Sequence, residues 1–79
     1  MTPLKPRIPP HVADVIRHLH PEIKKLVKEA IRALSANPLL GDPLKRDLEG
    51  LWKYRVRRYR VIYKPDHRSR DLLIYAVGY

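Results

Sequence analysis

Cysteine is absent from this 79-residue chain, which excludes disulfides and thiolate-metal sites. No apolar run approaches the length of a membrane-spanning helix, and the basic N-terminal stretch lacks the apolar segment of a signal peptide. The length predicts a single domain over residues 1–79. The absences fit a protein of the reducing cytoplasm, and we expect no membrane contact. A chain this short buries only about 60–65% of its extended surface, so we expect one modest core.

Acidic residues are nearly missing from one part of the chain. The formal net charge is +9, and residues 51–70 supply +7 of it because Asp66 is their only acid. The basic side chains of this stretch are Lys53, Arg55, Arg57, Arg58, Arg60, Lys64, Arg68 and Arg70. Such a field attracts polyanions, and arginine suits bidentate phosphate contact. The alternative is a solvated basic face that only keeps the protein soluble.

Residues 51–63, LWKYRVRRYRVIY, sort into two faces if a turn at Arg57-Arg58 joins two strands. The predicted cross-strand pairs are Val56–Tyr59, Arg55–Arg60, Tyr54–Val61, Lys53–Ile62 and Trp52–Tyr63. The aromatic face is expected to pack against helices, and the other carries Lys53, Arg55 and Arg60, with Ile62 and Lys64 further along. A one-residue slip would mix the faces, so the register is well specified. We interpret the basic face as an anion-binding platform, with RNA as the leading ligand.

Proline punctuates the rest of the chain. Residues 3–8 predict a short edge strand, and helices are expected to begin at Pro10 and Pro21, the second ending at Asn37-Pro38. Two apolar stripes at helical spacing are expected to face the core: Val12, Val15, Ile16 and Leu19, then Ile23, Leu26, Val27, Ala30, Ile31 and Leu34.

Residues 37–50 predict a connecting loop, followed by strands at 51–56, 59–64 and 71–77. The order is β-α-α-β-β-β. We therefore predict an α+β fold in which an N-terminal strand and a helical hairpin pack on a mainly antiparallel four-stranded sheet.

The motifs, taken in order, resemble the RelE/ParE superfamily of bacterial toxins over nearly the whole chain. The similarity lies in the helical hairpin ending in NP, the linker PLKRDLEGLW, the hairpin W-x-Y-R-V-x-x-Y-R-V-I-Y and the strand LLIYAVG. It implies a toxin that forms a hetero-oligomer with a cognate acidic antitoxin. RelE-like members cleave mRNA on the ribosome without a metal, whereas ParE-like members poison DNA gyrase.

The resemblance also implies site residues. Basic side chains on these two strands contact the scissile phosphate in RelE-like toxins, and Lys53, Arg55 and Arg60 match those positions here. The remaining basic residues of the hairpin and the next loop are expected to bind RNA: Arg57, Arg58, Lys64, Arg68 and Arg70.

Three departures from the family pattern stand out. The hairpin turn often holds a glycine in relatives, so Arg57-Arg58 predicts another turn type or some strain. The family chain continues into a tail carrying an Arg and a Tyr or His, and this sequence ends at Gly78-Tyr79. Weak or absent cleavage by the 79-residue form is therefore expected. Some relatives have, at the position of Asp42, a carboxylate that serves as the catalytic base. An Asp before Pro, however, is more often a turn residue.

RNA cleavage through the 2′-hydroxyl needs a base, an acid and cations around the phosphorane. Arginine supplies only the cations, and repulsion from Arg55 and Arg60 is expected to favour a neutral, proton-accepting amine on Lys53. His67 and Tyr79 are weaker candidates, because a loop histidine is more often a solvated one. None of the four histidines has metal-ligand spacing, so neither a metal nor another cofactor is expected.

Three functions remain open at this point: a RelE-like endoribonuclease, a ParE-like gyrase poison, and a non-catalytic module that binds an antitoxin or nucleic acid. The trio Lys53, Arg55 and Arg60 favours the first, and the short C-terminus favours the third.

Overall fold

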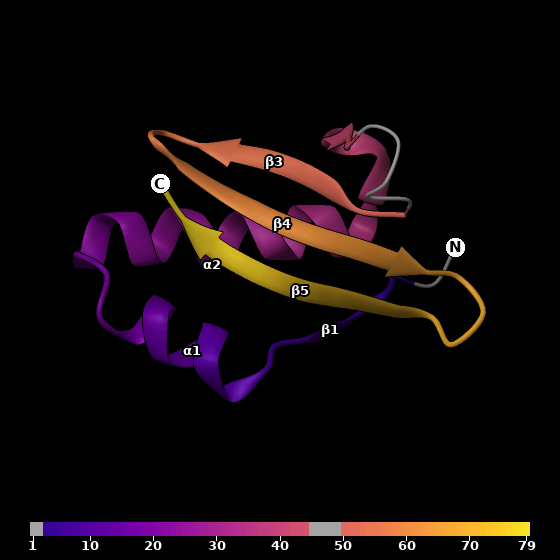
Figure 1. Cartoon of the computed structure of the whole chain (residues 1–79), viewed down its shortest axis with the longest axis horizontal. Helices are drawn as coiled ribbons and strands as arrows, with labels where there is room; N and C mark the ends of the chain where they lie inside the picture. Colours follow the sequence, from indigo (N-terminus) through magenta and orange to yellow (C-terminus); the bar gives the residue numbers. More distant parts are fainter. Residues whose placement is uncertain (1–2, 45–49) are drawn as a thin grey trace.

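One sheet covered by helices on a single face makes up the computed structural model, which describes residues 3–44 and 50–79 (Figure 1). The elements are β1 (Lys5–Arg7), α1 (Pro10–Arg17), α2 (Pro21–Ala36), a 3-10 helix (Pro38–Leu40), β2 (Asp42–Pro43), β3 (Trp52–Val56), β4 (Tyr59–Asp66) and β5 (Asp71–Gly78). The strand order is β1-β5-β4-β3-β2, with β1 parallel to β5 and the other neighbours antiparallel. The predicted α+β class and the edge position of β1 are confirmed.

Proline residues and side-chain caps mark the ends of the helices. Pro10 and Pro21 occupy first-turn positions, where the missing N–H costs nothing. His20 caps α2, since its Nδ1 accepts a hydrogen bond from the Glu22 backbone N–H at 3.3 Å. Asn37 ends α2, and its side chain accepts from the Leu39 N–H at 3.2 Å, which starts the 3-10 helix. Both predicted helices are therefore confirmed.

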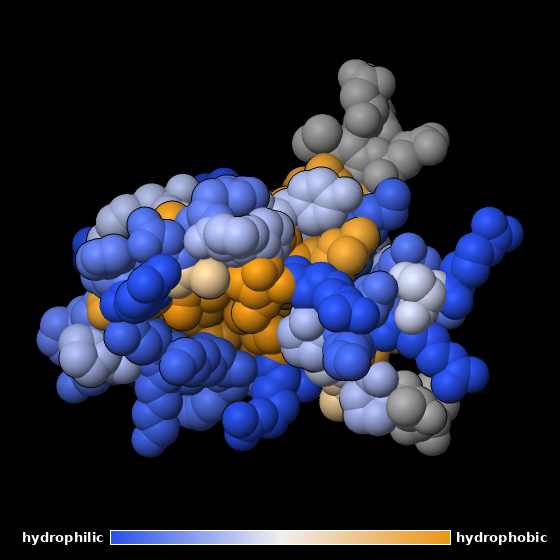
Figure 2. Space-filling model, turned by 90° about the horizontal axis from the view of Figure 1, so that it is seen from below, coloured by the Kyte–Doolittle hydropathy of each residue, from blue (hydrophilic) through white to orange (hydrophobic). Residues whose placement is uncertain are grey.

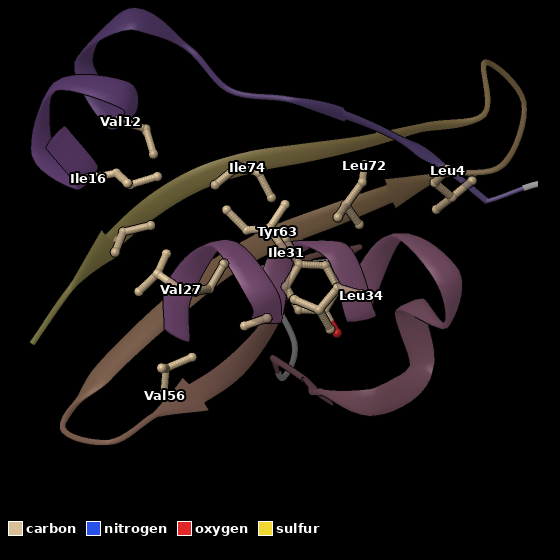
Figure 3. Packing of buried hydrophobic residues seen from close by; sticks show 13 residues of the cluster. Leu4, Val12, Ile16, Val27, Ile31, Leu34, Val56, Tyr63, Leu72 and Ile74 are labelled. Carbon is tan, nitrogen blue, oxygen red and sulfur yellow. The ribbon is translucent and has the colours of Figure 1, made fainter. Parts of the chain in front are cut away.

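The core lies between α2, α1 and the inner face of the sheet (Figure 3). It consists of the buried side chains of Leu4, Val12, Ile16, Val27, Ala30, Ile31, Leu34, Val56, Val61, Tyr63, Leu72, Ile74 and Val77. Ile23, Leu26, Leu19, Trp52 and Tyr54 pack against this cluster from its border. Val15 was wrongly expected in the core: it is 42% exposed, whereas Val12 and Ile16 are the buried residues of the short α1.

The sheet has five strands rather than the predicted four. Asp42 and Pro43, expected in a loop, pair with Lys53 and Trp52 and form the extra edge strand β2. Another irregularity lies in β5: Tyr63 pairs with Ile74 and Ile62 with Ala76, which leaves Tyr75 as the extra residue of a β-bulge.

Candidate functional site

The β3–β4 hairpin has the register predicted from its two-faced pattern. Arg55 lies directly opposite Arg60, and Lys53 lies opposite Ile62. Since opposed residues share a face, these side chains stand on the side of the sheet that the helices leave uncovered, which we call the open face. Lys53, Arg55 and Arg60 are all exposed there, and Lys64 is half-buried. The three proposed catalytic residues are thus brought together on one surface.

Two guanidinium groups in opposed positions are an unfavourable arrangement in a sheet. Arg55 is fixed toward the turn, where its Nε donates to the Arg57 carbonyl oxygen at 3.1 Å. Within residues 3–44 and 50–79, the ion pairs join Arg7 to Asp71 and Asp14 to its helical neighbours, not the open-face cations to an acid. Stability alone does not explain an Arg–Arg pair, whereas a bound polyanion would offset the repulsion.

Asp42 brings a carboxylate to the same surface. Its β2 position directly opposite Lys53 puts it on the open face beside the trio. The interpretation of Asp42 as a loop residue is therefore corrected.

The hydroxyl of Tyr63 holds this segment in place. Tyr63 is fully buried; its hydroxyl donates to the Pro38 carbonyl oxygen at 2.7 Å and accepts from the Gly41 N–H at 3.1 Å. Burial raises the pKa of the Tyr63 hydroxyl, although the Gly41 hydrogen bond acts the other way. A Cβ on Gly41 would collide with the Lys53 carbonyl oxygen and the Tyr63 hydroxyl, so glycine permits the close approach. Sequence reasoning missed this arrangement.

The turn of the hairpin is strained, as its sequence predicts. Arg57 has a φ of 59°, and Arg58 is not among the described residues with positive φ. Positive φ at the first central position alone is the pattern of a type II′ turn, which favours glycine there. Both side chains are exposed and extend the cationic open face beyond Arg55 and Arg60.

The loop after β4 forms a separate cationic end of the molecule. Asp66 Oδ1 accepts from the backbone N–H groups of Arg68 at 3.1 Å and Ser69 at 3.2 Å. The hydrogen bonds from Ser69 and then Arg68 hold the pKa of the Asp66 carboxyl below its usual value of 3.8, with help from the charge of Lys64. Asp66 lies six positions beyond Arg60 along β4, roughly 20 Å at the usual rise. His67, Arg68 and Arg70 therefore lie beyond the far end of β4 from Arg55 and Arg60.

Tyr79 lies away from the trio as well. Its ring stacks on Tyr59 with centroids 4.8 Å apart and an angle of 19° between the planes. Arg60 pairs with Gly78, so the alternation of the strands puts Tyr59 and Tyr79 on the helix-side face. Arg60 and Tyr79 therefore stand on opposite faces of the sheet. Among the described residues, no group of three or more His, Cys, Asp or Glu is arranged to hold a metal.

The fold and sequence both match known toxins. The toxin of the RelBE2 toxin-antitoxin complex from Mycobacterium tuberculosis is 30% identical to this chain, with a TM-score of 0.87 and 98% of each chain covered. A family model for the ParE toxin of the type II toxin-antitoxin system parDE matches residues 8–79. The chain belongs to the RelE/ParE superfamily of toxins. It is a toxin of a type II toxin–antitoxin system, and the predicted family is confirmed.

More distant RelE structures share the toxin's fold. The archaeal toxin in the RelE–RelB complex of Pyrococcus horikoshii is 23% identical, with a TM-score of 0.81 and coverage of 99% of this chain and 94% of that one. A free Escherichia coli RelE with two arginine-to-alanine substitutions is 16% identical, with a TM-score of 0.83 and coverage of 96% and 82%. A comparison with curated proteins finds no match. Within the described residues, no helix of the toxin is long and apolar enough to cross a membrane.

Proposed function

We propose that this toxin is an endoribonuclease that cleaves mRNA on the ribosome, in the bacterial cytoplasm, using the cations of its open face and no metal. The observation that carries the proposal is the directly opposed pair Arg55 and Arg60, with Lys53 on the same face. Two adjacent guanidinium groups match the charge that develops on a phosphorane, and such stabilisation is often the largest catalytic term. The likeness to RelE structures supports the same chemistry.

Each residue has a distinct role in the proposed reaction. The 2′-hydroxyl oxygen attacks phosphorus while its proton passes to the Asp42 carboxylate, and the phosphorane formed is bound by Arg55 and Arg60. The bond to the 5′-oxygen then breaks, leaving a 2′,3′-cyclic phosphate. Lys53 donates the proton that the leaving oxygen takes up. Arg57, Arg58 and Lys64 bind the flanking phosphates, and the distant Arg68 and Arg70 extend the RNA path.

Cleavage of mRNA on programmed ribosomes tests the proposal. Arg60→Ala should lower the cleavage rate about 10²–10³-fold, as for loss of one positioned charge donor. Arg68→Ala is the matched control, because it removes the same charge from an exposed site roughly 20 Å away and should keep most of the rate at saturating ribosomes. Equal losses in both variants would reject a site centred on Arg60.

The match to the ParE family model favours a second candidate, a DNA gyrase poison. In that case the hairpin would serve structure and partner binding rather than RNA chemistry. Inhibition of gyrase supercoiling without any RNA cleavage, unaffected by Arg60→Ala, would establish it. Tight antitoxin binding with neither activity would instead identify a non-catalytic member.

The proposed partner is a cognate acidic antitoxin, with which the toxin forms a hetero-oligomer. Solved relatives from Mycobacterium tuberculosis and Pyrococcus horikoshii were both determined as toxin–antitoxin complexes. The net charge of +9 supports an acidic partner, because opposite fields speed association and raise specificity.

A further inference from the structure

The β-bulge of β5 turns two successive side chains to the same face of the sheet. Ile74 and Val77 both belong to the buried core, although residues three positions apart point to opposite faces of a regular strand. The extra residue of the bulge removes this conflict, and it leaves Tyr75 and Ala76 together on the open face, beside Ile62. Bulges are frequent next to active sites, where they re-aim a side chain. The side chain re-aimed here is that of Tyr75, which is 46% exposed.

Tyr75 lies one strand away from the proposed catalytic cations. Arg60 pairs with Gly78, which follows Tyr75 by three positions, roughly 10 Å along β5 at the usual rise. An RNA strand with its scissile phosphate at Arg55 and Arg60 therefore has a neighbouring nucleotide within reach of this ring. Proteins that bind single-stranded RNA commonly combine such a cationic surface with aromatic side chains on which unpaired bases stack.

A cavity with a mainly apolar lining opens beside the ring. Its volume is about 680 Å³; Leu73 and Tyr75 line it from β5, and Ile8 and Pro9 line it from the segment between β1 and α1. Figure 2 looks at the molecule from the side of β1 and α1, where apolar surface lies exposed among hydrophilic residues. Cavities that hold small flat ligands have this composition, apolar side chains with a few polar groups among them. A nucleobase is a ligand of this kind.

The cavity also contains a cation. Arg7 lines it, lies opposite Leu73 in the sheet, and donates from Nε to the Asp71 carboxylate at 3.0 Å. Within residues 3–44 and 50–79 this ion pair occupies Nε alone, so the terminal nitrogens of the guanidinium can donate to another acceptor. Phosphate is an acceptor that a planar guanidinium suits well. An aromatic ring beside a phosphate donor favours a nucleotide over a wholly apolar ligand.

We propose that Tyr75 stacks on a nucleobase next to the cleavage site, and that the cavity beside it holds this base with Arg7 on the phosphate. The inference rests on the proposed RNA cleavage at the open face, to which it adds a positioning residue. Stacking accepts any base, because every base has a π-face. Tyr75 therefore contributes affinity and holds the strand over Arg55 and Arg60, with little preference for sequence.

Substitutions at Tyr75 separate stacking from its other roles. Tyr75→Leu keeps an apolar side chain but removes the ring, and Tyr75→Phe keeps the ring. Tyr79→Leu is the matched control, because Tyr79 is 78% exposed but stacks on Tyr59 at the helix-side face. In filter binding with a short single-stranded RNA, Tyr75→Leu should weaken affinity about tenfold, as for loss of one stacked base, and the other two variants less than about twofold. The slope of affinity against log salt should not change in Tyr75→Leu, since no phosphate contact is lost.

RNAs with a single abasic nucleotide test the base itself. At one position beside the scissile nucleotide, the wild type should lose about tenfold in affinity and Tyr75→Leu much less, because its ring is already absent. Equal losses in both proteins at every position, or wild-type RNA affinity of Tyr75→Leu while Arg60→Ala binds weakly, would overturn the stacking site but leave the open face. Weaker antitoxin binding by Tyr75→Leu with unchanged RNA affinity would overturn it in favour of a protein ligand. No RNA binding by the wild type would reject both this site and the proposed cleavage.

Discussion

The buried hydroxyl of Tyr63 joins Pro38 and Gly41, at 2.7 and 3.1 Å, and so fixes the segment that places Asp42 beside Lys53. A residue in the centre of the sheet thereby determines what stands at its edge. The hydroxyl satisfies one backbone acceptor and one backbone donor, and burial makes both bonds costly to lose.

Tyr63→Phe is predicted to lower the free energy of unfolding by about 1–3 kcal/mol, because the Pro38 carbonyl and the Gly41 N–H would lose their partner. Urea denaturation measures the change. Tyr75→Phe is the control, since this tyrosine is 46% exposed and should change stability by less than about 0.5 kcal/mol. Equal stability of the two variants would show that the hydroxyl does not hold the segment.

Local patterns of the sequence predict the hairpin but not β2. The alternation of residues 52–63 and a two-residue turn determine every pair of the β3–β4 ladder. In contrast, the strand at Asp42 and Pro43 follows a segment that is bonded to the hydroxyl of Tyr63, more than twenty positions away, and no local pattern of the sequence predicts such a contact. Only Gly41, a glycine before an Asp-Pro pair, offers a hint of close backbone approach.

In the candidate site too, local sequence patterns predict some of the residues, whereas others depend on the three-dimensional fold. Period-two alternation correctly groups Lys53, Arg55 and Arg60 on one face. It cannot show that Asp42 joins them, because that depends on β2. The two arginines of the loop after β4 are close to the trio in sequence but far from it in space, since β4 extends to Asp66 before the chain turns.

The strain in the hairpin turn gives a second prediction. Arg57 has positive φ, so Arg57→Gly should raise the free energy of unfolding by about 0.5–1 kcal/mol. The substitution removes the steric cost of the left-handed conformation, and the greater conformational entropy of glycine in the unfolded chain offsets part of that gain. Arg58→Gly, at the other turn position, lacks that relief and should destabilise the hairpin. The two unfolding curves are compared at one pH and salt concentration. The prediction fails if Arg57→Gly is no more stable than Arg58→Gly.

Acid unfolding should depend on Asp66. Its pKa in the folded protein lies below the ordinary value of 3.8, so the carboxylate stabilises the fold above that pH. As the pH falls through the folded pKa, the unfolded state takes up the proton first and this contribution is lost. Asp66→Asn does not titrate, so the stability gap between wild type and variant should shrink below pH 3.8. A gap that stays constant with pH would contradict the assignment.

Asp42 provides the sharpest test of the open face. Asp42→Asn removes the one described carboxylate directly opposite Lys53, so RNA should bind at least as tightly as to the wild type. If Asp42 accepts the proton of the 2′-hydroxyl, the cleavage rate at saturating ribosomes should nevertheless fall about 10²–10³-fold. Filter binding with a short single-stranded RNA measures the first quantity, and single-turnover cleavage measures the second. Arg60→Ala is the contrasting variant: it should lose rate and affinity together, with a binding slope against log salt shallower by about 0.7. Unchanged cleavage by Asp42→Asn would exclude Asp42 as the proton acceptor, because a residue that carries the proton cannot be replaced by an amide without loss of rate.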